Sequence, residues 1–156
     1  MNIEKAFQDY YPDDYSHCYG CGCENKHGHK IKSYWNGDES ICRFTPDDKY
    51  SGGMKDILYG GLIASLIDCH GAATAAAAKA KELGITMEKG KMPRFVTASL
   101  NVDYIAPTPL GVELEIRGSV KEIKNRKVTV SVSLTCENKI CAKGELIMIQ
   151  IKEDLK

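Results

Sequence analysis

The chain has 156 residues, a length that suits one domain with a core of its own. Lysine and arginine together number 21, as do aspartate and glutamate, so the formal charge is zero and no overall field attracts nucleic acid or an anionic membrane. Seven cysteines, with no secretory signal at the polar and acidic start, argue against a disulfide framework. We therefore expect free thiols in a soluble, cytoplasmic protein.

The first third of the chain predicts short elements. We expect one domain over residues 1–156, in which residues 1–29 form an N-terminal extension with a cysteine-rich loop. A short helix over residues 3–11 should stop before Pro12. Two short strands, 30–35 and 40–45, should then form a hairpin, because Asn-Gly-Asp at positions 36–38 is a strong turn signal.

One long helix is predicted from Gly60 to Leu83, with Gly84 as its C-terminal stop. Apolar residues recur there at helical spacing, and its many alanines favour helix. With Asp68 and His70 inside it, the segment is too polar to cross a bilayer convincingly. A helix so rich in alanine is thin, so a sheet can wrap closely around it.

Beyond Pro93 the apolar pattern changes to period two, as expected for strands with one buried face. Four long strands are predicted in a meander, with turns at 124–126 and 137–138. The fold class is therefore α+β, with about six antiparallel strands curved around one central helix. The apolar positions of the first long strand are Val96, Ala98, Leu100, Val102 and Tyr104.

A family resemblance rests on the segment YGGLIASLIDCHGAATAAAA, which looks like the central-helix motif of hotdog-fold thioesterases. The similarity is greatest to the branch with phenylacetyl-CoA-type and mammalian-type acyl-CoA thioesterases; Gly60, Gly61 and Asp68 match its motif. The segments RFVTASLNVDYIAPTPLG and CYGCGCENKHGHKI resemble the family's first long strand and its leader. The resemblance covers residues 18–149 and implies a hotdog fold that hydrolyses acyl-CoA, with no cofactor other than the CoA of the substrate.

The motif also has a physical rationale. Gly60 and Gly61 start the helix, where backbone N–H groups lack intrahelical acceptors and the helix dipole is positive, so a thioester oxygen could be polarised there. Hydrolysis also needs a base for water, or a carboxylate that attacks directly, and Asp68 fits either role.

Helix geometry predicts that this site is shared between chains. Eight residues separate Gly60 from Asp68, or about 12 Å of helix, so one helix cannot easily place both groups on one thioester. Antiparallel helices of a two-fold dimer could do so. The resemblance implies the same arrangement, and we expect a homodimer or a homotetramer.

Three further positions bear on the site. Tyr59 stands where the family commonly has histidine, and it either hydrogen-bonds the thioester or fills the pocket. Thr97 aligns with a residue that helps position water in the resembling branch, and alternation places it on a polar strand face with Ser99 and Asn101. His70 is two positions from Asp68, roughly 200° around the helix, so we expect it to be a packed or interface residue.

Cations are needed for the phosphates of CoA, and the candidates are Arg94, Lys124, Arg126 and Lys127. The spacing Cys18-x-x-Cys21, with Cys23 and His27 nearby, resembles half a zinc site, but no second such pair exists and we expect no metal. Two alternatives to hydrolysis stay open. One is an acyl-CoA binder or sensor without turnover, and the other is a thiol-based redox or zinc module, which would leave the helix motif unexplained.

Overall fold

The computed structural model describes residues 4–152, which form one central helix and one six-stranded antiparallel sheet. The helix predicted over residues 3–11 is a single 3-10 turn, and its first residue, residue 3, lies outside the described range. The elements in chain order are η1 (Phe7–Tyr10), η2 (Asp13–Tyr15), β1 (Ser33–Asn36), β2 (Glu39–Phe44), η3 (Asp48–Tyr50), α1 (Gly60–Glu82), β3 (Phe95–Tyr104), β4 (Leu114–Lys124), β5 (Lys127–Cys136) and β6 (Lys139–Gln150).

The strand order across the sheet is β1-β2-β4-β5-β6-β3. The hairpin β1–β2 and the run β4–β5–β6 agree with the prediction, but the meander of four long strands is wrong. β3 pairs with β6 instead of β4, so the first long strand forms an edge of the sheet. Alternation of apolar and polar residues specifies the face of a strand but not its neighbour, which explains the error.

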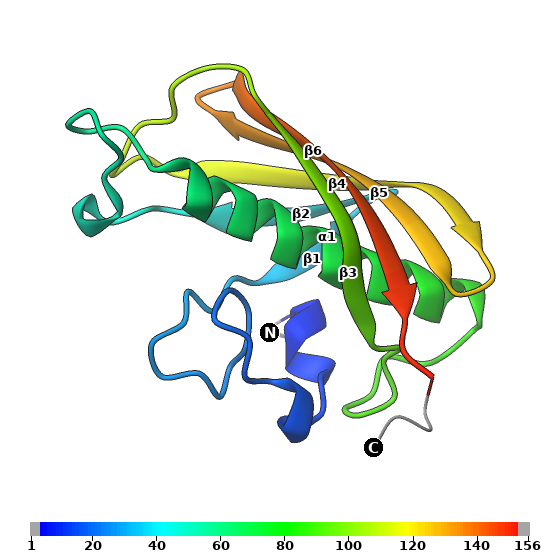
Figure 1. Cartoon of the computed structure of the whole chain (residues 1–156). Helices are drawn as coiled ribbons and strands as arrows, with labels where there is room; N and C mark the ends of the chain where they lie inside the picture. Colours follow the sequence, from blue (N-terminus) through cyan, green and yellow to red (C-terminus); the bar gives the residue numbers. More distant parts are fainter. Residues whose placement is uncertain (1–3, 153–156) are drawn as a thin grey trace.

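The sheet curves around α1, which lies along its concave side, and the N-terminal segment packs against the same helix (Figure 1). The helix begins at Gly60 and ends at Glu82, followed by Gly84 in a left-handed conformation at φ +66°, as predicted. Its length and composition would also suit a membrane span, yet 67% of its most apolar 18-residue stretch is buried inside the fold. The helix packs mainly against β5 and β4 and also contacts β3 and β6, and its buried alanines belong to the hydrophobic core.

Glycines set the distance between the helix and the sheet. A side chain at Gly71 would lie 2.8 Å from Leu146, and one at Gly144 would lie 2.4 Å from Ile67. A Cβ at Gly118, on β4, would lie 2.8 Å from Thr74 Oγ1 on α1. Since atoms cannot pack at such distances, α1 approaches the sheet closely only because these positions lack side chains.

The long strand β3 forms one of the two edges of the sheet, opposite the short edge strand β1. Its register against β6 slips between Thr97 and Ser99, a β-bulge that reverses which side chains face the helix. Several large apolar side chains on this strand remain open to solvent, with Val96 49% and Tyr104 56% exposed. The predicted burial of the apolar face of this strand is therefore incomplete within one chain.

Candidate active site

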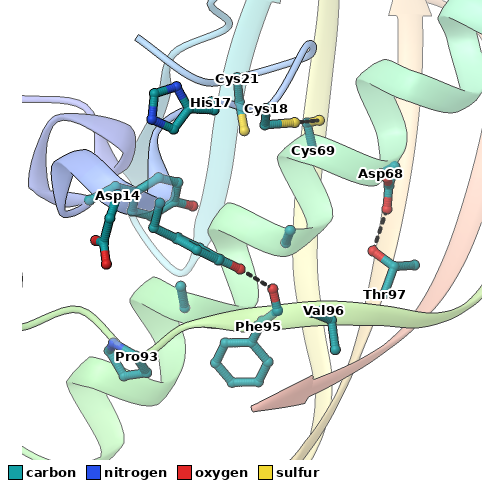
Figure 2. A pocket seen from close by; sticks show the side chains of 14 residues that line it. Asp14, His17, Cys18, Cys21, Asp68, Cys69, Pro93, Phe95, Val96 and Thr97 are labelled. Carbon is teal, nitrogen blue, oxygen red and sulfur yellow. Dashed lines mark hydrogen bonds between the residues drawn. The ribbon is translucent and has the colours of Figure 1, made fainter. Parts of the chain in front are cut away.

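A cavity of about 360 Å³ lies between α1, the start of β3 and the N-terminal segment (Figure 2). Its wall is mostly apolar, and Asp68 and Thr97 are among its few polar groups. The lining residues are Tyr11, Asp14, Tyr15, His17, Cys18, Cys21, Asp68, Cys69, Ala72, Ala76, Pro93, Phe95, Val96 and Thr97. A mostly apolar pocket with a few converging polar groups is typical of a small-molecule site.

Asp68 and Thr97 meet in this cavity although they come from different elements. The Thr97 hydroxyl donates a 2.6 Å hydrogen bond to Oδ1 of Asp68, and no other hydrogen bond of residues 4–152 reaches that carboxylate. Asp68 is half-buried on α1, in the third turn of the helix. One carboxylate oxygen is thus fixed, while Oδ2 is left available to water or substrate.

The bulge in β3 makes this contact possible. Alternation predicts that Thr97 shares a face with Ser99 and Asn101, and this prediction is wrong. Ser99 and Asn101 line a separate shallow hollow beside Lys121, whereas Thr97 turns toward α1. Farther along the strand Tyr104, seven positions away, also reaches α1, which requires the extra residue of a bulge between them.

Gly60 and Gly61 lie at the N-terminus of α1, far from the cavity that holds Asp68. Neither backbone N–H donates in any turn or cap hydrogen bond of the described residues, as expected at the start of a helix. Both glycines sit under aromatic rings. A Cβ at Gly61 would lie 2.3 Å from the Tyr59 ring, and the Tyr104 hydroxyl donates to the Gly60 carbonyl at 2.8 Å.

Tyr59 precedes the helix in an extended conformation and makes no side-chain cap. Its ring lies over Gly61 and remains 41% exposed. The structure thus brings Asp68 and Thr97 together, and Tyr59 with the two glycines, but within one chain the two groups stay eight helical residues apart, about 12 Å.

The candidate phosphate-binding cations lie at a different place. Arg94 stacks over the Tyr15 ring, with its guanidinium carbon 5.7 Å from the ring centroid. Arg126 donates from Nε to the Gln150 carbonyl at 2.9 Å, on the β4–β5 hairpin that also carries Lys124 and Lys127. Backbone N–H groups of residues 150 and 151 donate to the carbonyls of Arg126 and Arg94, so the four candidate cations lie near one end of the sheet. None of the four lines the cavity around Asp68.

Comparison with known proteins identifies the family. The family model described as the thioesterase superfamily matches residues 55–142, which include α1, Asp68 and Thr97. A thioesterase superfamily protein from Shewanella loihica PV-4 is 44% identical, over 90% of this chain and 98% of that one, with a TM-score of 0.67. The chain belongs to the thioesterase superfamily. A search of curated proteins found no match.

More distant structures show the same fold. The E. coli PaaI protein of the phenylacetic acid degradation operon is 14% identical, with 80% and 81% of the two chains covered and a TM-score of 0.65. A Streptococcus mutans protein solved with acetyl-CoA bound is 18% identical, with 78% and 88% covered and a TM-score of 0.63. The hotdog fold expected from the resemblance is confirmed.

In this thioesterase-superfamily chain, a cysteine that the sequence analysis did not single out lies beside the motif aspartate. Cys69 follows Asp68 on α1, and its Sγ lies 3.6 Å from that of Cys18. Hydrogen bonds from the thiols of Cys21 and Cys69 to the Cys18 sulfur lower the pKa of Cys18 to about 2. Because Cys21 and Cys69 each donate a hydrogen bond to Cys18, the pKa of Cys21 is raised to about 12 and that of Cys69 is raised well above its usual value. The sequence did contain a clue to the importance of Cys69, because this residue directly follows the motif residue Asp68.

His70 is fully buried and takes no part in the cavity, as predicted for a packed residue. Ser33 Oγ lies 2.9 Å from Nδ1, and Ser40 Oγ lies 3.0 Å from Nε2. Gln8 extends the network by donating to Ser33 at 2.9 Å. Burial lowers the pKa of His70 to about 4, so the ring is neutral at pH 7 and serves the core.

Proposed function

We propose that the protein hydrolyses an acyl-CoA thioester to the free acid and CoA, with Asp68 as the general base or the nucleophile. The observation that carries this proposal is the Asp68 carboxylate, held by Thr97 on one oxygen and open on the other, in a mostly apolar cavity. The apolar part of the wall suits an acyl chain, and aryl, medium-chain and branched acyl groups are all candidates.

Either role for Asp68 gives a balanced reaction. As a base, Oδ2 takes a proton from water while the water oxygen attacks the thioester carbonyl, and collapse of the intermediate expels CoA as the thiolate. As a nucleophile, the carboxylate attacks the carbonyl, CoA thiolate leaves, and water then hydrolyses the mixed anhydride. In both cases we assign stabilisation of the oxyanion to the amides of Gly60 and Gly61 of a second chain, and we propose that the reaction needs no cofactor beyond the CoA of the substrate.

We further propose that the site is completed by a second copy of the chain. The edge strand β3 is paired on one side only, with β6, and its exposed apolar side chains offer a surface that a two-fold partner would cover. Antiparallel pairing of two β3 strands would bring Asp68 of one protomer toward Gly60 and Gly61 of its partner. The proposed pairing would thus bring together at one site the carboxylate and the glycine amides, which lie far apart within one chain. Such a shared site would be present in a dimer and also in a tetramer made of two dimers.

The CoA moiety is assigned to the basic end of the sheet, where Arg94, Lys124, Arg126 and Lys127 would meet its phosphates. The acetyl-CoA complex of the Streptococcus mutans protein supports an acyl-CoA ligand for this fold. All seven cysteines are free, which supports a reducing compartment such as the cytoplasm. The neutral net charge supports neither nucleic acid nor a membrane as a partner.

The test is a panel of CoA thioesters with aryl, medium-chain and branched acyl groups, assayed by release of the CoA thiol. The wild type should turn over at least one class, and Asp68→Asn should lose all but a tenth or less of kcat, a loss of at least about 1.4 kcal/mol, with unchanged folding. Saturable binding of a thioester without turnover would overturn hydrolysis and support the acyl-CoA sensor instead. Retention of activity by Asp68→Asn would overturn the role of Asp68.

A further inference from the structure

Three sulfur atoms from distant parts of the chain converge beside Asp68. Cys18 and Cys21 belong to the N-terminal loop, and Cys69 belongs to α1, 51 positions beyond Cys18. Their Sγ atoms all lie within 4.8 Å of one another, and among residues 4–152 no other group of three cysteine, histidine or acidic side chains has this geometry. Figure 2 shows the Cys18 and Cys69 sulfurs facing each other, with the Cys21 sulfur beside them.

The spacing of the sulfurs fits ligands of one metal ion. Zinc–sulfur bonds of about 2.3 Å at tetrahedral angles place two sulfurs about 3.8 Å apart. The Cys18–Cys69 separation of 3.6 Å is close to this value, whereas a disulfide would require about 2.05 Å. Three thiolates are also a donor set that favours zinc over hard cations such as magnesium or calcium.

The loop is shaped around the third sulfur. A Cβ at Gly20 would lie 2.3 Å from Cys69 Sγ, so only glycine allows the loop to wrap this closely around it. The Gly22 N–H donates to the Cys18 carbonyl at 2.8 Å and closes the turn between the two loop cysteines.

The other ligands suggested by the sequence do not belong to this cluster. Cys23 is exposed and points its thiol to Glu24, and His27 is also exposed. The expectation of no metal rested on the incomplete set within residues 18–27, and Cys69 supplies the sulfur that this set lacked. Cys42, Cys136 and Cys141 are buried in strands of the sheet and are not members of the cluster.

We propose that Cys18, Cys21 and Cys69 form a binding site for one zinc ion, which fastens the N-terminal loop to α1. The three residues line the cavity that also holds Asp68, so the fourth tetrahedral position is filled from that cavity by water or by a soft ligand such as a thiolate. The site is independent of the proposed hydrolysis, because zinc binding is measured without substrate.

The experiment uses the full chain, purified with reductant and a chelator, and then titrated with zinc in competition with a chromophoric chelator. We expect one zinc per wild-type chain and a loss of affinity of at least about a hundredfold in Cys18→Ser and in Cys69→Ser. Cys23→Ser, in the same loop, is the matched control and should bind like the wild type. Cobalt in place of zinc should give sulfur-to-metal charge-transfer bands in the wild type and in Cys23→Ser only.

A second readout covers the case in which Cys69→Ser fails to fold. Cys18 is exposed, so Cys18→Ser should keep the circular dichroism spectrum of the wild type, and zinc should raise the melting temperature of the wild type but not of this variant. Less than about a fifth of an equivalent of zinc in the reduced wild type would overturn the proposal. Equal binding by Cys18→Ser would do so as well.

Discussion

Thr97 Oγ1 donates a 2.6 Å hydrogen bond to Oδ1 of Asp68, and this contact joins the edge strand β3 to the middle of α1. A single threonine thereby fixes which carboxylate oxygen is occupied and which faces the cavity. Both Thr97 and Tyr104 reach α1, because the register of β3 slips between them, immediately after Thr97. Without the bulge, alternation would place either Thr97 or Tyr104 on the outer face of the sheet.

The first prediction concerns this hydrogen bond. Thr97→Val keeps the shape of the side chain but removes the donor, and a hydrogen bond to a charged acceptor contributes about 1.5–3 kcal/mol. If that stabilisation serves the transition state, kcat on the best thioester should fall about ten- to a hundredfold, while Thr97→Ser should stay within about threefold of the wild type. Ser99→Ala, on the outer side of the same strand, is the control and should leave kcat unchanged. Equal activity of Thr97→Val and wild type would reduce Thr97 to an ordinary strand residue.

The second prediction concerns Tyr59, where this chain departs from the common histidine. The Tyr59 hydroxyl makes no hydrogen bond to any residue of 4–152, and its ring covers Gly61. Tyr59→Phe should therefore keep kcat within about threefold, under about 1 kcal/mol, whereas Tyr59→Ala should change the preference among acyl groups. A hundredfold fall in kcat for Tyr59→Phe at unchanged KM would instead show that the hydroxyl acts in the transition state.

The third prediction tests the shared site. Leu100→Lys introduces a charge on the exposed part of β3 and should convert the proposed oligomer to monomers that keep their circular dichroism spectrum but lack the proposed thioester hydrolysis. Leu83→Lys is the control, because Leu83 is similarly apolar and 52% exposed but lies just beyond the end of α1. Analytical ultracentrifugation at the assay concentration provides the measurement. A fully active monomer, wild type or variant, would contradict the shared site.

The fourth prediction concerns pH. The pKa of His70 is about 4 in the folded protein and about 6.5 in an unfolded chain, so between these values the unfolded state binds the proton more readily. The free energy of unfolding should therefore fall as the pH drops from about 6.5 toward 4, by up to about 3 kcal/mol from this residue. Urea unfolding at several pH values should show a smaller fall for His70→Gln than for the wild type. His17→Gln, at an exposed position, should behave like the wild type.

The central helix was predictable because its signals are local. Its alanines, its apolar spacing, Gly60 at the start and Gly84 at the end all act within a few residues of each other, and the helix has the predicted limits to within one residue. The strands from Leu114 onward were also predictable, since turns at 124–126 and 137–138 join neighbours in sequence. The placement of β3 beside β6 could not be predicted in this way, because residues 95–104 pair with a strand that begins 35 positions later.

Contacts between distant parts of the chain were likewise not predictable in the candidate site. The motif spacing singled out Asp68, and the resemblance added Thr97, but the direction of the Thr97 side chain depends on a bulge that leaves no mark in the alternation pattern. The pairing of Cys69 with Cys18 is a product of tertiary packing across 51 positions, so no local spacing rule for metal ligands includes it. The sequence by itself shows only the two loop members of that cluster, Cys18 and Cys21.

The absence of side chains at Gly71, Gly118 and Gly144 has a consequence for how this protein can diverge. Because α1 meets the sheet at these points, a larger residue there would require the contacting side chain of Leu146, Thr74 or Ile67, or the helix itself, to shift. New acyl preferences should therefore arise by changes in the opposite wall of the cavity, contributed by residues 11–17, which precede the cysteine cluster and can vary without moving the helix. Laboratory selection for a different acyl group should accumulate substitutions in that segment while the three glycines stay fixed.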